Sequence, residues 1–244
     1  MNSVIIGGTA GVGREIANAL AVRGHNLLIT GKDERDVDTC VANLRIRFGA
    51  KVSGLAVDAT SHENYLITLK DAGAKFGTID NLFFPIGSSN QLDNGGLGIP
   101  EIAAIFSSNF MSVVLAVKVL SAQFHKTERV TIIGFSSIAA IRGRSENVIY
   151  SASKKALESY FESLKMIFLN KNIVTKYYRL GYIDTHQSYG KNLLFPKIDP
   201  KRVATHIISN LNGKRTTVYY PLYWGLIAML LRFLPITLYK KVTS

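Results

Sequence analysis

Short apolar segments rich in β-branched residues alternate along the chain with longer segments of helical periodicity. Uninterrupted apolar runs at residues 4–6 and 82–84 indicate strands buried on both faces, as in a parallel sheet covered by helices. Strict alternation of this kind favours an α/β fold with a doubly wound parallel sheet and right-handed crossovers. We expect strands at residues 3–7, 26–30, 51–57, 80–84, 129–135, 173–179 and 216–220. We expect helices at residues 11–24, 33–48, 61–76, 100–125, 150–170, 200–212 and 222–234.

Length and composition agree with a single domain that covers residues 1–244. A chain of 244 residues, 47% of them hydrophobic, can bury a sizeable core and is unlike a disordered or collagen-like chain. The single cysteine, Cys40, has no partner for an internal disulfide, and the sequence holds no Cys/His cluster typical of structural zinc. We therefore expect no metal and a reducing, cytoplasmic location. We find no secretory signal in the N-terminal residues.

The net charge of +12 is unevenly distributed. Residues 1–125 carry 10 Lys and Arg against 11 Asp and Glu, whereas residues 126–244 carry 19 against 6. The excess of basic residues in the second half predicts an anionic partner for that half. Nucleic acid is a weaker interpretation, because we find no recognition motif and no strand that alternates aromatic and basic residues.

A glycine-rich segment, Gly7-Gly8-Thr9-Ala10-Gly11-Val12-Gly13, lies between the first expected strand and the first expected helix. Glycines here allow a tight turn, close approach to a pyrophosphate and close packing of the helix on the sheet. The N–H groups and the positive dipole at the helix N-terminus then face the phosphates. This pattern predicts a Rossmann-type dinucleotide site with contacts from Gly7, Thr9, Gly11, Val12 and Gly13.

The end of the second strand indicates which dinucleotide binds. An acidic residue there would hydrogen-bond the ribose 2′-hydroxyl and repel a 2′-phosphate, but this chain has Gly31 at that position. Lys32 follows and can pair with a 2′-phosphate, so we expect NADPH, although Lys32 could also be a solvated loop lysine. Asp58 ends the third strand, where its carboxylate could accept from the adenine amino group or cap the next helix.

Tyr150 and Lys154 lie four residues apart at the start of an expected helix, hence on one face. Free tyrosine has a pKa near 10, and a neighbouring ammonium favours the phenolate, so the two residues could cycle a proton. Ser137 ends the strand that starts near residue 129. Its hydroxyl can hydrogen-bond a substrate carbonyl oxygen as negative charge develops there.

Together with Asn109, these motifs resemble the short-chain dehydrogenase/reductases, and the resemblance covers residues 3 to about 220. It implies strand order 3-2-1-4-5-6-7 and subunit contacts through helices 100–125 and 150–170, in a homodimer or homotetramer. It also implies a catalytic tetrad. In this family the tyrosine passes the proton, the lysine binds the nicotinamide ribose and lowers the tyrosine pKa, the serine orients the carbonyl, and the asparagine holds a relay water. The corresponding residues are Asn109, Ser137, Tyr150 and Lys154.

Three positions depart from the family pattern. Ile6 replaces the usual Thr before the first glycine, and Phe84-Pro85-Ile86-Gly87 replaces Asn-Asn-Ala-Gly. Leu180-Gly181 replaces the usual Pro-Gly. Gly87 and Thr185 keep the family's cofactor contacts, Thr185 at the carboxamide. These changes lie at positions that surround the cofactor, not at the residues expected to transfer the proton.

Several residues are candidates for substrate binding. Residues 185–199 form the longest irregular segment and are interpreted as a substrate lid. We expect Arg142, Arg144, Lys191 and Phe195 to line an amphiphilic, anion-binding rim, although the cations could equally be surface charges. Residues 222–239 form an apolar tail with Tyr and Trp at one end and lysines at the other. Its uncharged run is too short to span a bilayer and suits either an interfacial anchor or a buried helix at a subunit contact.

The last third also resembles reductases with membrane-associating tails, of the decaprenylphosphoryl-2-keto-erythro-pentose reductase kind, in segments 199–204, 218–221 and 230–235. This implies a keto-sugar substrate carried on a lipid phosphate, in cell-envelope or polysaccharide synthesis, at the inner face of the membrane. The alternatives are a soluble 3-oxoacyl or small-carbonyl reductase and a non-catalytic dinucleotide-sensing or scaffold protein.

Overall fold

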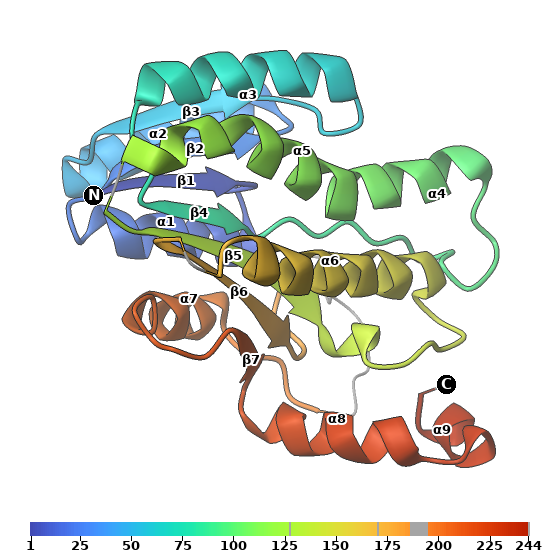
Figure 1. Ribbon diagram of the computed structural model, residues 1–244. Coiled ribbons are helices and arrows are strands. Elements are labelled where there is room, and N and C mark those ends of the chain that lie inside the picture. The colour runs from blue at the N-terminus through green and yellow to red at the C-terminus, as the bar shows by residue number, and fades with distance from the viewer. Residues whose placement is uncertain (127, 170, 186–194, 244) are drawn as a thin grey trace.

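A computed structural model describes residues 1–126, 128–169, 171–185 and 195–243. Seven parallel strands form one twisted sheet at the centre of the molecule (Figure 1). The order 3-2-1-4-5-6-7 expected from the resemblance is confirmed. Each expected strand forms, with its ends displaced by at most two residues. In spatial order the strands are β3 (Val52–Ala56), β2 (Asn26–Gly31), β1 (Asn2–Ile6), β4 (Asn81–Phe84), β5 (Val130–Ser137), β6 (Ile173–Leu180) and β7 (Thr217–Tyr220).

Helices cover both faces of the sheet, which explains why its strands are apolar without alternation. One core cluster lies between the sheet and the helices α1 (Gly11–Ala21), α2 (Glu34–Phe48) and α7 (Pro200–Ser209). The other lies between the sheet and the helices α3 (His62–Phe76), α5 (Ser112–Leu120) and α6 (Val148–Ile167). The central strands β1, β4 and β5 therefore bury both rows of side chains almost completely, whereas the edge strand β3 leaves Ser53 and Ala56 exposed.

The helix expected at residues 100–125 is one continuous run with a change of geometry inside it. Two α-helical parts, α4 (Ile99–Phe106) and α5, are joined by the π-helical turn η1 (Ser107–Met111), and the 3-10 helix η2 (Ser121–Lys126) ends the run. The stretch Ile99–Phe124 is long and apolar enough to cross a membrane by length and composition alone. It packs against α3 and α6, and it contains Asn109, which is fully buried, so we interpret it as a core helix of this fold.

The close approach of α1 to β1 explains one glycine of the turn. A Cβ on Gly13 would lie 2.1 Å from the main-chain oxygen of Gly7 and 3.0 Å from the Pro85 ring. Only glycine fits there without displacing the backbone. Gly7 itself has φ +93°, a left-handed conformation that glycine adopts without strain. The glycine turn and the Pro85-Ile86 segment are therefore packed directly against each other.

The apolar tail predicted at residues 222–239 contains two helices, and the first of them is the helix expected at residues 222–234. These are α8 (Tyr223–Phe233) and α9 (Ile236–Thr243), which lie beyond β7 at the carboxyl edge of the sheet (Figure 1). The indole of Trp224 packs over Gly181, where a Cβ would lie 1.9 Å from the indole nitrogen. Gly181, the residue of this pair that keeps the family pattern, thus makes room for the first turn of α8.

Candidate active site

A cavity of about 1760 Å³ opens at the carboxyl ends of the central strands. It is larger than the roughly 300–1,000 Å³ pocket that holds one small ligand, so it has room for a dinucleotide and a second molecule. Ligands bind at this edge in open α/β sheets, where the strand order reverses between β1 and β4. The walls come from the glycine turn, the loop after β4, the segment after β5, the start of α6 and the two C-terminal helices.

The glycine turn fits a pyrophosphate. Ala10, the N-cap residue of α1, supplies no side-chain cap, and no acidic residue lies in the first turn of that helix. Ala10, Gly11 and Val12 line the cavity, so the helix N-terminus is available to an anion. The methyl group of Thr185 lies against Gly11, 3.3 Å from the position of a Cβ there. The glycine turn and the segment that follows β6 are therefore in contact on the side of the cavity where we expect the cofactor.

Lys32 and Asp58, expected at the adenosine end, form an ion pair of 3.0 Å. The Lys32 side chain is 77% exposed, so this pair contributes little to stability and leaves the ammonium free to exchange partners. The main-chain hydrogen bond from Thr60, together with Lys32, lowers the pKa of Asp58. The space for an acid at Gly31 is missing, because a Cβ there would lie 2.6 Å from the Thr9 methyl group.

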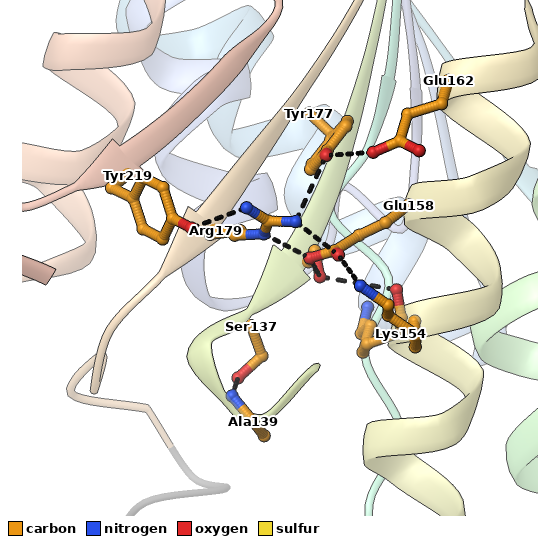
Figure 2. Close-up of polar contacts among 10 residues, drawn as sticks. Ser137, Ala139, Lys154, Glu158, Glu162, Tyr177, Arg179 and Tyr219 are labelled. Atoms are coloured by element: carbon orange, nitrogen blue, oxygen red, sulfur yellow. Dashed lines mark hydrogen bonds and ion pairs between the residues drawn. The ribbon is translucent and has the colours of Figure 1, made fainter. Parts of the chain in front are cut away.

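Ser137 and Tyr150 meet on the opposite wall of the cavity. Ser137 is the last residue of β5, and its hydroxyl accepts from the main-chain N–H of Ala139 at 3.1 Å (Figure 2). Burial raises the pKa of Tyr150, and the Ser137 hydrogen bond and the Arg144 charge partly offset that rise. Tyr150 is therefore protonated at neutral pH in this structure and can donate a proton.

Lys154 lies one helical turn from Tyr150 and is 2% exposed. Its ammonium donates to the main-chain oxygens of Ile86 at 2.6 Å and Phe135 at 2.9 Å, and lies 5.8 Å from the centre of the Tyr150 ring. Because burial removes water from the ammonium, the pKa of Lys154 falls to about 7. The two carbonyls hold the lysine at the floor of the cavity, between the loop that follows β4 and the last residues of β5.

Asn109 lies in the π-helical turn η1. Its side-chain oxygen accepts from the Ser88 N–H at 2.6 Å, and its amide donates to the Ser88 oxygen at 2.9 Å and to the Ser153 hydroxyl at 3.0 Å. Turns of this kind within α-helices are frequent at functional sites. The side chain thus holds the loop after β4 against α6.

A buried ion pair holds α6 against β6 (Figure 2). Arg179 donates to both oxygens of Glu158, at 2.7 and 2.8 Å, and also to the Tyr219 hydroxyl at 2.6 Å. Ser136, the neighbour of Ser137, donates to the same carboxylate at 2.8 Å. Glu158 lies one turn beyond Lys154, so this network fixes the part of α6 next to Lys154 and Tyr150.

The expected substrate residues have different surroundings. Arg144 lines the cavity, and its buried Nε atom has no hydrogen-bond partner among the described residues. Arg142 is not a cavity residue: its guanidinium donates to the main-chain oxygens of Leu231 and Leu234 and lies 4.5 Å from the centre of the Tyr239 ring. This makes Arg142 a cap for the end of α8 rather than a residue free to bind substrate.

Phe195 lines the cavity with its ring 4.8 Å from that of Trp224. Lys191 and most of the expected lid lie outside the described residues. The ends of that segment are tied together, because Asp184 N–H donates to the Ile198 oxygen and Ile198 N–H to the Tyr182 oxygen, each at 2.9 Å. Further lining residues that motif reasoning missed come from the tail: Trp224, Ile227, Leu231, Tyr239 and Lys241. The tail's apolar composition was visible in the sequence, but nothing there indicated that it faces the cavity.

Comparison with known proteins identifies the family. The short chain dehydrogenase family model matches residues 2–192. The very-long-chain 3-oxoacyl-CoA reductase of Bos taurus is 23% identical over 98% of this chain and 77% of its own length. The 3-oxoacyl-(acyl-carrier-protein) reductase of Chlamydia muridarum is 25% identical over 77% of this chain and 76% of its own. A short chain dehydrogenase of Burkholderia cenocepacia in complex with NADP has a TM-score of 0.80 at 20% identity, covering 89% of this chain and 94% of that one.

The chain therefore belongs to the short chain dehydrogenase family. It is an oxidoreductase that acts on the alcohol and carbonyl groups that the family interconverts.

The pKa of Lys154 gives a stability prediction. Between the folded value of about 7 and the ordinary value of 10.5, the unfolded chain binds a proton that the folded protein lacks. Stability from this group therefore rises with pH, by at most about 1.4 kcal/mol per pH unit. We expect the free energy of unfolding of the wild type, relative to Lys154→Met, to increase by about 2 kcal/mol from pH 7 to pH 9. Urea denaturation at both pH values measures it.

The exposed neighbour Lys155 provides the control for this experiment, because its side chain is 55% exposed. The Lys155→Met comparison measures the pH dependence that follows from removing an exposed lysine from the same helix. A pH dependence in Lys154→Met no larger than that in Lys155→Met would show that burial does not lower the Lys154 pKa.

Proposed function

We propose that this protein is an NADPH-dependent reductase that converts a carbonyl group into an alcohol, with Asn109, Ser137, Tyr150 and Lys154 as its catalytic residues. The observation that carries the proposal is that Ser137, Tyr150 and Lys154 line one cavity, with the Lys154 ammonium 5.8 Å from the centre of the Tyr150 ring and held by two main-chain oxygens. A binding module has no need of this arrangement, which argues against a dinucleotide sensor or scaffold.

The chain's own residues account for the proton. A carbonyl oxygen placed between Ser137 and Tyr150 receives hydrogen bonds from both hydroxyls, which stabilise the negative charge that develops there. NADPH, when bound, supplies the hydride to the carbonyl carbon. Tyr150, held protonated by burial, gives its proton to the oxygen, and the Lys154 ammonium can return one. Asn109 keeps the loop after β4 closed on α6 while this happens.

Removal of the Tyr150 hydroxyl tests the assignment. General acid catalysis contributes roughly 10²–10⁴ in rate, so we expect Tyr150→Phe to lose at least about a hundredfold in kcat while NADPH binding persists. Turnover is followed by NADPH absorbance with a panel: an acetoacetyl thioester, a keto-sugar phosphate and a keto-sugar polyprenyl phosphate. Tyr160→Phe, on the same helix but packed among Phe110 and Phe161, is the control and should keep full activity. Unchanged turnover in Tyr150→Phe would remove Tyr150 as the proton donor.

The preference for NADPH over NADH rests on Gly31 and Lys32. An acidic side chain that would select NADH has no space at Gly31, and the exposed ammonium of Lys32 stands at the same strand end. Gly7, Thr9, Gly11, Val12, Gly13, Asp58, Gly87 and Thr185 would hold the rest of the dinucleotide, with Lys154 and Tyr150 at the nicotinamide ribose.

Substitution of Lys32 should distinguish the two cofactors. Loss of a charged hydrogen bond costs about 1.5 kcal/mol or more, so Lys32→Ala should weaken NADPH binding roughly tenfold and NADH binding little. Fluorescence titration with each nucleotide measures the two dissociation constants. Lys51→Ala, at the opposite end of the sheet, should change neither. Equal losses for NADPH and NADH in Lys32→Ala would contradict the 2′-phosphate contact.

The cavity wall favours an amphiphilic, anionic substrate. Arg144 and Lys241 place two cations in it, and the Nε atom of Arg144 has no partner among the described residues. Trp224, Ile227 and Leu231 add an apolar surface from α8. A keto-sugar, carried on a lipid phosphate, would use both kinds of surface, and this supports a role in cell-envelope or polysaccharide synthesis.

A second candidate is a soluble 3-oxoacyl or small-carbonyl reductase. Two relatives carry 3-oxoacyl reductase names, which favours acyl thioesters as substrates. On this alternative the apolar tail lies at a contact in a homodimer or homotetramer. The substrate panel described for Tyr150→Phe distinguishes the two candidate functions. The keto-sugar reductase predicts the highest kcat/KM for the lipid-linked phosphate, whereas the 3-oxoacyl reductase predicts it for the thioester.

The outer surface of α8 and α9 supports contact with an anionic membrane from the cytoplasmic side. Large apolar side chains are exposed on it, and no Asp or Glu occurs in residues 200–244. Arg232 and Lys240 supply cations on the same helices. An amphipathic pair of this kind suits the interfacial layer, whereas subunit contact would bring like charges together. The exposed apolar residues are Leu222, Tyr223, Leu226, Met229, Leu230, Phe233, Ile236 and Leu238.

Cosedimentation with vesicles tests this surface. The wild type should bind vesicles that contain phosphatidylglycerol and not pure phosphatidylcholine vesicles. Leu226→Ser with Leu230→Ser and Phe233→Ser, all exposed, should abolish binding without unfolding the protein. Ile46→Ser with Ile67→Ser, exposed on α2 and α3, is the control and should still bind. If the triple variant instead changes the molar mass by light scattering, the surface is a subunit contact.

A further inference from the structure

Asp93, in the loop between β4 and α4, holds the first turn of the catalytic helix α6. Its two carboxylate oxygens accept from the N–H groups of Ile149 and Tyr150, both at 2.8 Å. Its main-chain oxygen accepts from Val148 N–H at 3.1 Å. The first three N–H groups of α6 thus all donate to one residue, which precedes them in the sequence by more than fifty positions.

The start of α6 lacks a cap of its own. Asn147, at the N-cap position, has φ 56° and ψ 44°, and its side chain caps no N–H group. No acidic residue lies in the first turn of α6. In α2 and α7 the cap is local, because Asp33 and Asp199 each accept from an N–H group two or three residues ahead. In α6 the cap comes from another part of the chain.

The burial of Asp93 indicates a specific role. The residue is 2% exposed, and an isolated carboxylate is costly to bury. Here the N–H groups and the positive end of the α6 dipole compensate its charge. The carboxylate and the uncapped helix end therefore stabilise each other, and each would be unfavourable without the other.

The contact includes the main chain of Tyr150 itself. Tyr150 is the third residue of α6, so its own N–H group is one of the three that Asp93 holds. The same loop contains Ser88, whose main chain pairs with the Asn109 side chain. Asp93 and its neighbours Asn90 and Asn94 also line the cavity. This loop therefore joins Asn109 to Tyr150 and forms part of the substrate wall.

We propose that Asp93 is a positioning residue, which holds Tyr150 at the distance from Ser137 that proton transfer requires. The proposal rests on the proposed function of Tyr150 as proton donor. Asp93 does not touch the reacting atoms; it acts through the main chain at the start of α6. A displacement of this turn would move the Tyr150 hydroxyl, and small displacements of a catalytic group can cost a hundredfold in rate.

Three variants test the proposal with the best carbonyl substrate of the panel. Asp93→Ala removes both side-chain acceptors and should lower kcat at least tenfold, with the NADPH dissociation constant changed less than twofold. Asp93→Asn keeps one acceptor oxygen and should recover part of kcat. Asp80→Ala is the control, because Asp80 also accepts a main-chain N–H, from Asn2 at 2.7 Å, but at the opposite edge of the sheet. It should lower stability without lowering kcat.

Hydrogen exchange provides a readout that needs no substrate. The amides of Ile149 and Tyr150 should lose protection in Asp93→Asn while the rest of α6 keeps it. Unchanged kcat in a folded Asp93→Ala, or unchanged protection in Asp93→Asn, would overturn the positioning role. Failure of the proposed function shows elsewhere, as full turnover in Tyr150→Phe, so the two outcomes remain distinguishable. If Asp93→Ala does not fold, Asp93→Asn carries both measurements.

Discussion

The buried ammonium of Lys154 is the contact on which the arrangement of the site depends. Among the described residues it has no carboxylate partner, and its acceptors are the main-chain oxygens of Ile86, just after β4, and Phe135, near the end of β5. These strands are neighbours in the sheet, so one side chain from α6 fixes the helix over the carboxyl ends of both. An unpaired buried cation is costly, and here it is maintained because several other contacts hold α6 in the same place.

Those contacts follow one another along the helix. Asp93 takes the first N–H groups, Ser153 binds Asn109, Lys154 binds the two carbonyls, and Glu158 binds Arg179. The partners come from the loop after β4, from η1, from β5 and from β6, so α6 cannot rotate or slide without breaking several of these hydrogen bonds together. Burial removes water from the charges in this network, and that desolvation offsets much of the stability the contacts provide. The main effect of the network is therefore to hold α6 in one geometry. A reaction that depends on the distance between Ser137 and Tyr150 benefits from that restriction.

The parts of this arrangement that could be predicted from the sequence are local. The glycine turn and the Tyr150–Lys154 spacing are short patterns whose geometry follows from one turn of helix, and alternating segments indicate a parallel sheet. The cap on α6 was not predictable, because Asp93 is an ordinary loop aspartate until the fold brings it to Val148. The π-helical turn at Asn109 has no sequence signal for the same reason. Arg142 was predicted to bind substrate because of its position between Ser137 and Tyr150 in the sequence. In the folded protein its guanidinium instead binds the main-chain oxygens at the end of α8.

The cations of the second half therefore have several distinct roles, although the sequence shows them only as a net charge. Arg179 and Arg142 are occupied within the fold, by Glu158 and by the carbonyls that end α8. Arg144 and Lys241 face the cavity, and Arg232 and Lys240 belong to the outer helices. Because α8 presents Trp224 to the cavity and Phe233 to solvent, one helix forms both the inner wall and the outer surface. A substrate that is part lipid and part anion would contact the outer surface first and then the cavity wall. The position of the tail therefore bears more on substrate choice than the net charge does.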